Sequence, residues 1–195
     1  RVFVPFTALV LLASATGAPE PAAGQVPIQG WTGAGPYPTA QVARDAYPNF
    51  YAIFGAPWKG VPAEAEGVVD LADPFPGEVA GGGLVIVRRV FRSGEGRPLD
   101  LRLGYAGSVD VFFNRRPVFS GREPACEAER ADPSRPECTV LLKLPVRRGL
   151  NEIFLMVASG AGGWGFQATA SEPLQDKLLR HGDMEEVWAT PDTFL

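Results

Sequence analysis

The glycine-rich stretch at residues 159–166 carries the spacing that most suggests chemistry. Gly160, Gly162 and Gly165 follow an apolar run and match the G-x-G-x-x-G spacing of a dinucleotide-binding loop. Such a loop needs a helix directly after it, because the helix N-terminus holds the pyrophosphate. Here the residues from Trp164 to Ala170 alternate between apolar and small or polar types, which predicts a strand. We therefore interpret the glycines as a hairpin turn rather than a nucleotide site.

Residues that could form a catalytic centre are sparse. The single histidine, His181, lies in a predicted terminal helix, where water is a more usual neighbour than a catalytic triad. The sequence has neither a G-x-S-x-G nucleophile elbow nor a Walker A pattern. Glu64 and Glu66 could form a carboxylate pair, yet alternation along a strand or loop explains their spacing. We assign no active site and no cofactor, and we expect the chain itself not to be an enzyme.

The cysteines and the clustered acidic residues are the side chains whose types could bind a metal ion. Cys126 and Cys138 flank a polar, proline-containing segment, and in an exported protein such a pair usually staples its loop. Two thiols alone fall short of the four ligands of a structural zinc site. Asp70, Asp73 and Glu78 could approach a calcium ion, but no EF-hand spacing is present. We predict a Cys126–Cys138 disulfide and no metal site.

Composition and the first residues indicate an exported globular protein. The chain has 195 residues, 46% hydrophobic and 21% charged, and a formal net charge of −4 without a long basic run, so nucleic acid is not an expected partner. Residues 1–15 begin with Arg1, continue through an apolar run and end in a small-x-small cleavage pattern, which indicates a signal peptide. No segment reaches the roughly 20 apolar residues of a membrane helix. We expect a secreted or periplasmic protein with a longer natural N-terminus.

Short runs with the two-residue period of strands dominate the chain from Leu84 onward. Leu99, Leu101 and Leu103 share one face of such a run, whereas the run at 151–158 is apolar on both faces and should be a central strand. Turn residues separate the runs, and no helices intervene, so the pattern predicts an all-β antiparallel sandwich or jelly roll. The runs cover residues 84–92, 98–105, 108–114, 116–121, 138–146, 151–158 and 164–170.

The segments around these runs complete the expected organisation. Residues 16–38 are rich in Gly, Pro and Ala, which suits a linker with a possible leading strand at 26–31. The sandwich domain is expected at 39–171, with aromatic loops and a short strand at 67–71. Leucines at helical spacing after a possible Ser171 cap predict a short helix over Ser171–Arg180, within a terminal segment at 172–195.

Three stretches of the sequence resemble the galactose-binding-like β-sandwich modules of exported bacterial proteins. The resemblance rests on APWKGVPAEAEGVVDL, on RRVFRSGEGRPLDLRLGYAGSVDVFFNRRPVFSG and on LPVRRGLNEIFLMVASGAGGWGFQATA, and it covers about residues 25–170. Two turns depart from the family pattern. Ala106-Gly107 stands where Ser-Asp is frequent, and Asn114-Arg115 stands where Asn-Gly, which suits a type I′ hairpin better, is frequent.

The tail EEVWATPDTFL is similar to the entry into a β-propeller of the SMP-30/gluconolactonase-like class. This second resemblance covers about a dozen residues. It implies a downstream domain beyond Leu195, and with it the alternative that the chain is the N-terminal part of a lactonase-like hydrolase.

Carbohydrate binding is the function that the first resemblance implies. A sugar site needs an exposed aromatic ring and planar polar side chains. Each candidate residue could instead have a purely structural role. Trp164 and Tyr105 lie at the ends of apolar faces and suit packing in the core. Asn114, Arg115 and Arg116 suit a solvated hairpin tip. Trp31 and Trp58 lie among aromatic loops, where packing is again the default. The candidates are Trp164, Tyr105, Asn114, Arg115 and Arg116.

These observations favour a non-catalytic carbohydrate-binding or accessory module of an exported protein, carrying no metal or cofactor. Two alternatives stay open. One is the N-terminal part of a propeller hydrolase, and the other is a structural module that binds protein through an exposed apolar patch.

Overall fold

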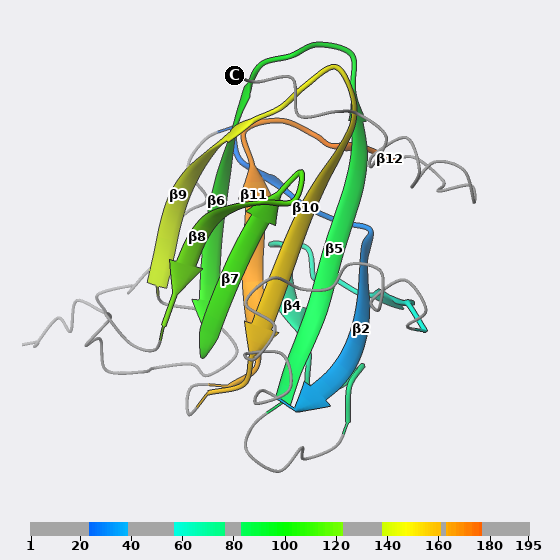
Figure 1. The fold of residues 1–195 in the computed structure, drawn as a ribbon, viewed down its shortest axis with the longest axis vertical. Helices are drawn as coiled ribbons and strands as arrows, with labels where there is room; N and C mark the ends of the chain where they lie inside the picture. The colour runs from blue at the N-terminus through cyan, green and yellow to red at the C-terminus, as the bar shows by residue number, and fades with distance from the viewer. Residues whose placement is uncertain (1–23, 39–56, 77–82, 123–137, 161–162, 177–195) are drawn as a thin grey trace, which may run out of the picture.

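The structure is a computed structural model that describes residues 24–38, 57–76, 83–122, 138–160 and 163–176. All regular structure in these ranges is β-strand, and the strands form two antiparallel sheets (Figure 1). The predicted signal peptide, Cys126, His181 and the propeller-like tail lie outside the described residues. Those predictions stay predictions, and so does the disulfide, of which only Cys138 is described, as the first residue of its strand.

One sheet has five strands. Its order is β1-β11-β6-β9, and β4 also pairs with β11, so β11 is shared by three neighbours. The strands are β1 (Val26–Pro27), β4 (Val68–Asp70), β6 (Pro98–Ala106), β9 (Cys138–Pro145) and β11 (Gly165–Ala170).

The other sheet has seven strands. Its order is β3-β2-β5-β10-β7-β8, and β12 pairs with the end of β5. The strands are β2 (Trp31–Pro38), β3 (Lys59–Val61), β5 (Gly83–Ser93), β7 (Ser108–Phe113), β8 (Arg116–Gly121), β10 (Gly149–Ala158) and β12 (Gln175–Asp176).

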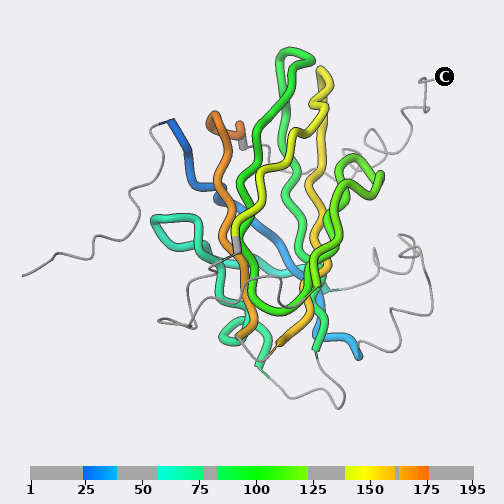
Figure 2. The backbone as a smooth tube through the Cα atoms, turned by 90° about the vertical axis from the view of Figure 1, so that its left-hand side faces the viewer, coloured from blue at the N-terminus to red at the C-terminus, as the bar shows by residue number. Residues whose placement is uncertain are grey.

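The topology confirms the predicted sandwich. Every run predicted between residues 84 and 170 is a strand, and β10 lies between β5 and β7, which confirms it as a central strand. From β9 to β12 each strand lies in the opposite sheet from the one before it, as consecutive strands of a jelly roll often do. Figure 2 shows the resulting layers from the side.

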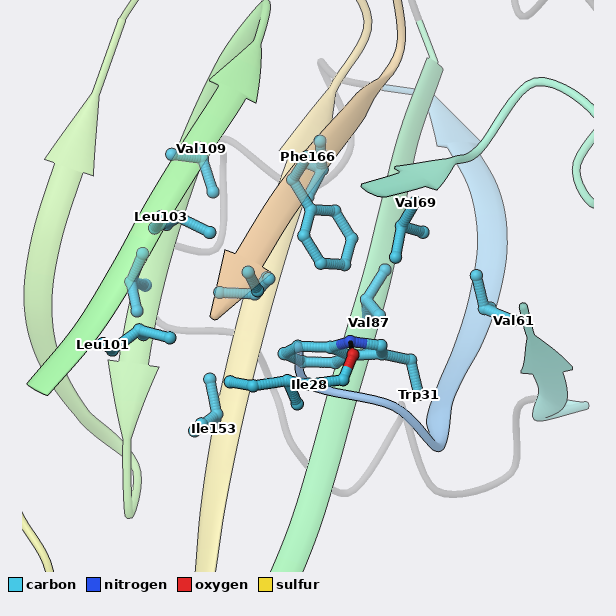
Figure 3. Packing of buried hydrophobic residues seen from close by; sticks show 14 of the residues in the cluster. Ile28, Trp31, Val61, Val69, Val87, Leu101, Leu103, Val109, Ile153 and Phe166 are labelled. Atoms are coloured by element: carbon cyan, nitrogen blue, oxygen red, sulfur yellow. Dashed lines mark hydrogen bonds between the residues drawn. The ribbon is translucent and has the colours of Figure 1, made fainter. Parts of the chain in front are cut away.

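The space between the sheets holds the main core. Leu99, Leu101 and Leu103 of β6 are fully buried there, as their alternation predicted. Trp31 packs edge-on against Phe166, with ring centroids 5.1 Å apart, and its indole N–H donates to the Ile28 carbonyl at 3.0 Å (Figure 3). Burying a side chain of this size stabilises the fold by about 1.5–3 kcal/mol.

A second apolar cluster lies on the outer face of the seven-stranded sheet. It explains why β10 is apolar on both faces: Ile153 and Leu155 point into the main core, while Phe154 and Met156 point outward. Tyr37 and Trp58 pack against this outer cluster. The cluster consists of Leu84, Ile86, Phe112, Phe154, Met156 and Ala158, each at most 9% exposed.

Two sequence-based expectations differ from the structure. The helix predicted over Ser171–Arg180 is wrong in its described half, because Gln175–Asp176 forms β12. The Ser171 hydroxyl, expected to cap a helix, instead accepts from the Asp100 backbone N–H at 3.3 Å, and Pro173 disfavours a helical conformation for the residue before it. The expected linker at 16–38 is also in part a piece of the sandwich, because β1 and β2 occupy 26–27 and 31–38.

Candidate functional site

Gly160 and Gly163 are joined by paired backbone hydrogen bonds, which confirms a turn in the glycine-rich stretch, but the predicted hairpin is wrong because β10 and β11 lie in different sheets. The N–H of Gly160 donates to the Gly163 carbonyl at 3.1 Å, and the reverse bond measures 3.2 Å. Strand β11 follows directly, so the helix that a pyrophosphate would need is not there. The turn carries the chain from one sheet to the other rather than joining two paired strands.

The five predicted ligand residues lie at opposite ends of the sandwich. Trp164 and Tyr105 are at the end where β10 leads to β11 and β6 leads to β7. The other three follow β7, whose six residues span about 20 Å. A single small sugar therefore cannot contact both groups.

Trp164 is half-buried and packs against the main core. Its indole N–H donates to the Val157 carbonyl at 3.1 Å. Its ring lies so close to Gly83 that a Cβ there would be 2.8 Å from the ring. Both contacts belong to the fold, which favours the packing role over the sugar-stacking role.

Tyr105 joins the two sheets. Its half-buried ring packs on the core and meets Phe119 of β8 edge-on, with centroids 6.0 Å apart. The hydroxyl oxygen approaches β8 closely, because a Cβ on Gly121 would lie 2.3 Å from it. A residue larger than glycine at position 121 would displace this ring.

The hairpin tip between β7 and β8 is tied to the neighbouring strand β10. Asn114 and Arg115 have φ values of 48° and 69°, the conformation of a type I′ turn, although the second residue is not the usual glycine. The Asn114 side chain donates to Asn151 Oδ1 at 3.0 Å and accepts from the Glu152 N–H at 2.9 Å. Asn114 thus holds the hairpin on β10, while Arg116 is exposed.

Asn151 is a structural residue that the sequence analysis did not single out. It is 0% exposed, and its Oδ1 also accepts from the Arg147 N–H at 3.0 Å. Its Nδ2 donates to the carbonyls of Arg147 and Gly149, at 2.7 and 3.2 Å. One amide therefore fixes the β9–β10 turn and links it to the β7–β8 hairpin.

Glu152 is a buried carboxyl group on the outer face of the seven-stranded sheet, 2% exposed. Burial raises its pKa from 4.5 to about 7, and the nearby guanidinium groups of Arg88 and Arg115 act in the opposite direction. A pKa near 7 suits proton transfer, but a group this buried lacks access to a substrate. The arrangement indicates a structural charge cluster.

Arg88 connects this cluster to the neighbouring strands. Its guanidinium carbon lies 3.9 Å from the centroid of the Trp58 ring, and its Nε–H points to Thr32 Oγ1 at 3.4 Å. Burial lowers the pKa of Arg88, and the charge of Glu152 opposes that shift. The signal in the sequence was the presence of charged residues inside two apolar runs, LVIVRRVFR and NEIFLMVA.

A polar depression of about 240 Å³ lies at the end of the sandwich opposite Trp164, where β12 meets the β5–β6 turn. In Figure 1 this end is at the top. Ser93 Oγ orders the turn by donating to the Glu95 carbonyl at 2.7 Å. Arg97 and Glu172 form an ion pair across the rim. The lining includes Arg92, Glu95, Arg97, Glu172, Leu174 and Gln175.

The described residues show no group of three or more His, Cys, Asp or Glu side chains placed to hold a metal ion. Asp70, one of the acids weighed as a calcium ligand, accepts from the Ala72 N–H at 2.8 Å within its own turn. Within the same ranges we find no helix with the length and apolar character needed to cross a membrane.

Comparison with known sequences gives no assignment, because neither a family model nor a curated protein matches the chain. Solved structures give partial overlaps. A β-glucosidase from Kluyveromyces marxianus overlaps 82% of this chain and 17% of its own, with 17% identity and a TM-score of 0.46. A GH2 β-galacturonidase from Eisenbergiella tayi, solved with glycerol, overlaps 75% of this chain and 23% of its own, with 12% identity and a TM-score of 0.45.

The epithelial adhesin 9 A domain from Candida glabrata, solved with Galβ1-4GlcNAc, overlaps 77% of this chain and 82% of its own, with 10% identity and a TM-score of 0.35. These scores are too low to place the chain in a family or to transfer a ligand to it. The chain spans less than a quarter of the two glycosidases. The fold defines the class of the chain, which is a two-layer antiparallel β-sandwich.

Proposed function

We propose that the chain is a non-catalytic carbohydrate-binding module of an exported protein, with a galactose-binding-like jelly roll, that acts as an accessory to a further domain. The observation that carries the proposal is the depression between β12 and the β5–β6 turn. It places guanidinium, carboxylate and amide groups around a half-buried leucine, Leu174. Planar polar groups beside an apolar surface suit a pyranose, whose ring presents hydroxyls at its edge and C–H groups on its faces.

The interactions of the polar side chains outside the depression support the same function. The amides of Asn114 and Asn151 and the carboxyl of Glu152 are occupied within the fold. Trp164, the aromatic ring first considered as a sugar platform, uses its N–H on the Val157 carbonyl. By contrast, the charged and amide side chains that line the depression at the β5–β6 end are exposed or half-buried.

A glycan-array screen of the 195-residue chain, followed by calorimetric titration of each hit, tests the function. We expect saturable binding of at least one carbohydrate, with affinity unchanged in Trp164→Phe because that half-buried ring packs against the core. The exposed Arg116→Gln is a second control from the hairpin tip. If no carbohydrate binds, the chain is not a sugar-binding module. Loss of binding in Trp164→Phe with unchanged melting temperature would move the site to the other end of the sandwich.

A further inference from the structure

The charges around the depression point to a particular class of ligand, on the basis of the proposed function. The lining holds two arginines, Arg92 and Arg97, and two glutamates, Glu95 and Glu172, so the two positive charges equal the two negative charges. An acidic sugar would meet two carboxylates as well as two guanidinium groups. A charged ligand therefore gains no net attraction, and its own desolvation stays uncompensated.

A neutral sugar suits this arrangement better. Each hydroxyl is both a donor and an acceptor, whereas a guanidinium only donates and a carboxylate only accepts. The Arg97–Glu172 pair presents one of each, side by side. Two adjacent hydroxyls can then accept from Arg97 and donate to Glu172 at once, and hydrogen bonds to charged groups are the stronger kind.

The size of the depression limits the ligand further. Its volume of about 240 Å³ is below the roughly 300–1,000 Å³ of pockets that enclose drug-sized ligands. One ring fits this space, and an oligosaccharide would extend out of it. The walls come from segments far apart in the sequence, because Gln175 of β12 pairs with Arg92 of β5. The ordered Ser93 turn and this pairing hold the walls before any ligand arrives.

We propose that the depression binds one neutral hexose unit through two adjacent hydroxyls, with Arg97 as the donor and Glu172 as the acceptor. Exposed ion pairs contribute little to stability. Arg97 and Glu172 have side chains 56% and 27% exposed, so either can be replaced without unfolding the protein. For an open single-ring site, we expect a Kd on the order of 1 mM.

The experiment is an NMR titration of the full chain with glucose, galactose, mannose and galacturonic acid. We expect at least one neutral hexose to saturate with shifts at residues 92–97 and 172–175, and galacturonic acid to bind at least tenfold more weakly. Arg97→Gln and Glu172→Gln should each weaken the neutral hexose at least fivefold. Arg102→Gln, an exposed arginine farther along β6, is the matched control and should bind normally.

Three results would overturn the inference. The first two leave the proposed carbohydrate-binding function intact, and the third removes both. Carbohydrate binding that both glutamine variants retain would place the site elsewhere and leave the proposed function standing. Equal or tighter binding of galacturonic acid would refute the neutral class. Failure of every glycan, on the array and in the titration, would remove the inference together with the function.

Discussion

Replacing Glu152 with glutamine should make the protein more stable above pH 7. The carboxyl is 2% exposed, and burial raises its pKa from 4.5 to about 7 despite Arg88 and Arg115 nearby. The folded protein therefore holds this proton more tightly than the unfolded chain does. The resulting stabilisation is complete below pH 4.5 and is lost as the pH rises through about 7.

The size of the effect follows from the two pKa values. Each pH unit between them corresponds to about 1.4 kcal/mol, so the interval from 4.5 to about 7 corresponds to about 3 kcal/mol. Glutamine has nearly the shape of the protonated acid and does not ionise. The free energy of unfolding of Glu152→Gln, relative to the natural chain, should therefore rise by about 3 kcal/mol between pH 4.5 and pH 8.5.

Urea denaturation followed by tryptophan fluorescence, at several pH values in this range, measures the difference. Groups common to both proteins, including His181, cancel in the comparison. Glu95→Gln removes an exposed carboxylate from the β5–β6 turn and controls for the loss of one negative charge. A difference that stays constant with pH, or a variant less stable than the natural chain at pH 8.5, would refute the reasoning. It would show that the two arginines outweigh the cost of burying the ionised carboxylate.

Two further predictions concern the turns. Asn151→Ala should lower the free energy of unfolding by about 3 kcal/mol, because it leaves several partly buried backbone groups of the β9–β10 turn without their partner. Combined with Asn114→Ala, its effect in denaturation curves should be less than additive, since the two amides share a hydrogen bond, and full additivity would contradict this. Gly107→Ala should cost at least about 2 kcal/mol, because Gly107 has a φ of +82° and a Cβ would lie 2.3 Å from the Ala158 carbonyl oxygen. Gly94→Ala, with no atom within 4 Å of the added carbon, should change the melting temperature little, and equal losses in both would rule out the steric explanation.

The strands were predictable because their signal is local. Alternation in β6 identified Leu99 and Leu103 as core residues, and the two-sided apolar run identified β10 as central. The terminal helix was not predictable in this way. Its leucine spacing is helical, but Leu174 packs against the sandwich core, and the Ser171 hydroxyl bonds to β6, contacts that depend on the finished fold.

The sites were less predictable because they depend on register. Glu152 and Arg88 stand out as charges in apolar runs, yet the β10–β5 pairing of Phe154 with Arg88 is what places them diagonally on one face. The Arg97–Glu172 pair joins residues 75 positions apart. It depends on β12 pairing with β5, in a segment where the sequence pattern indicated a helix.

The division of polar groups between fold and surface also bears on how a module of this kind would act. The buried polar groups, Glu152, Arg88 and Asn151, fix strands and turns and are closed to ligands. Exposed and half-buried polar side chains surround the depression, which is large enough for one ring and lies beside a strand of only two residues, β12. A site of that size cannot supply tight binding by itself. Its contribution to an exported protein would be to raise the local concentration of a linked domain at a glycan surface, where repeated weak contacts add together.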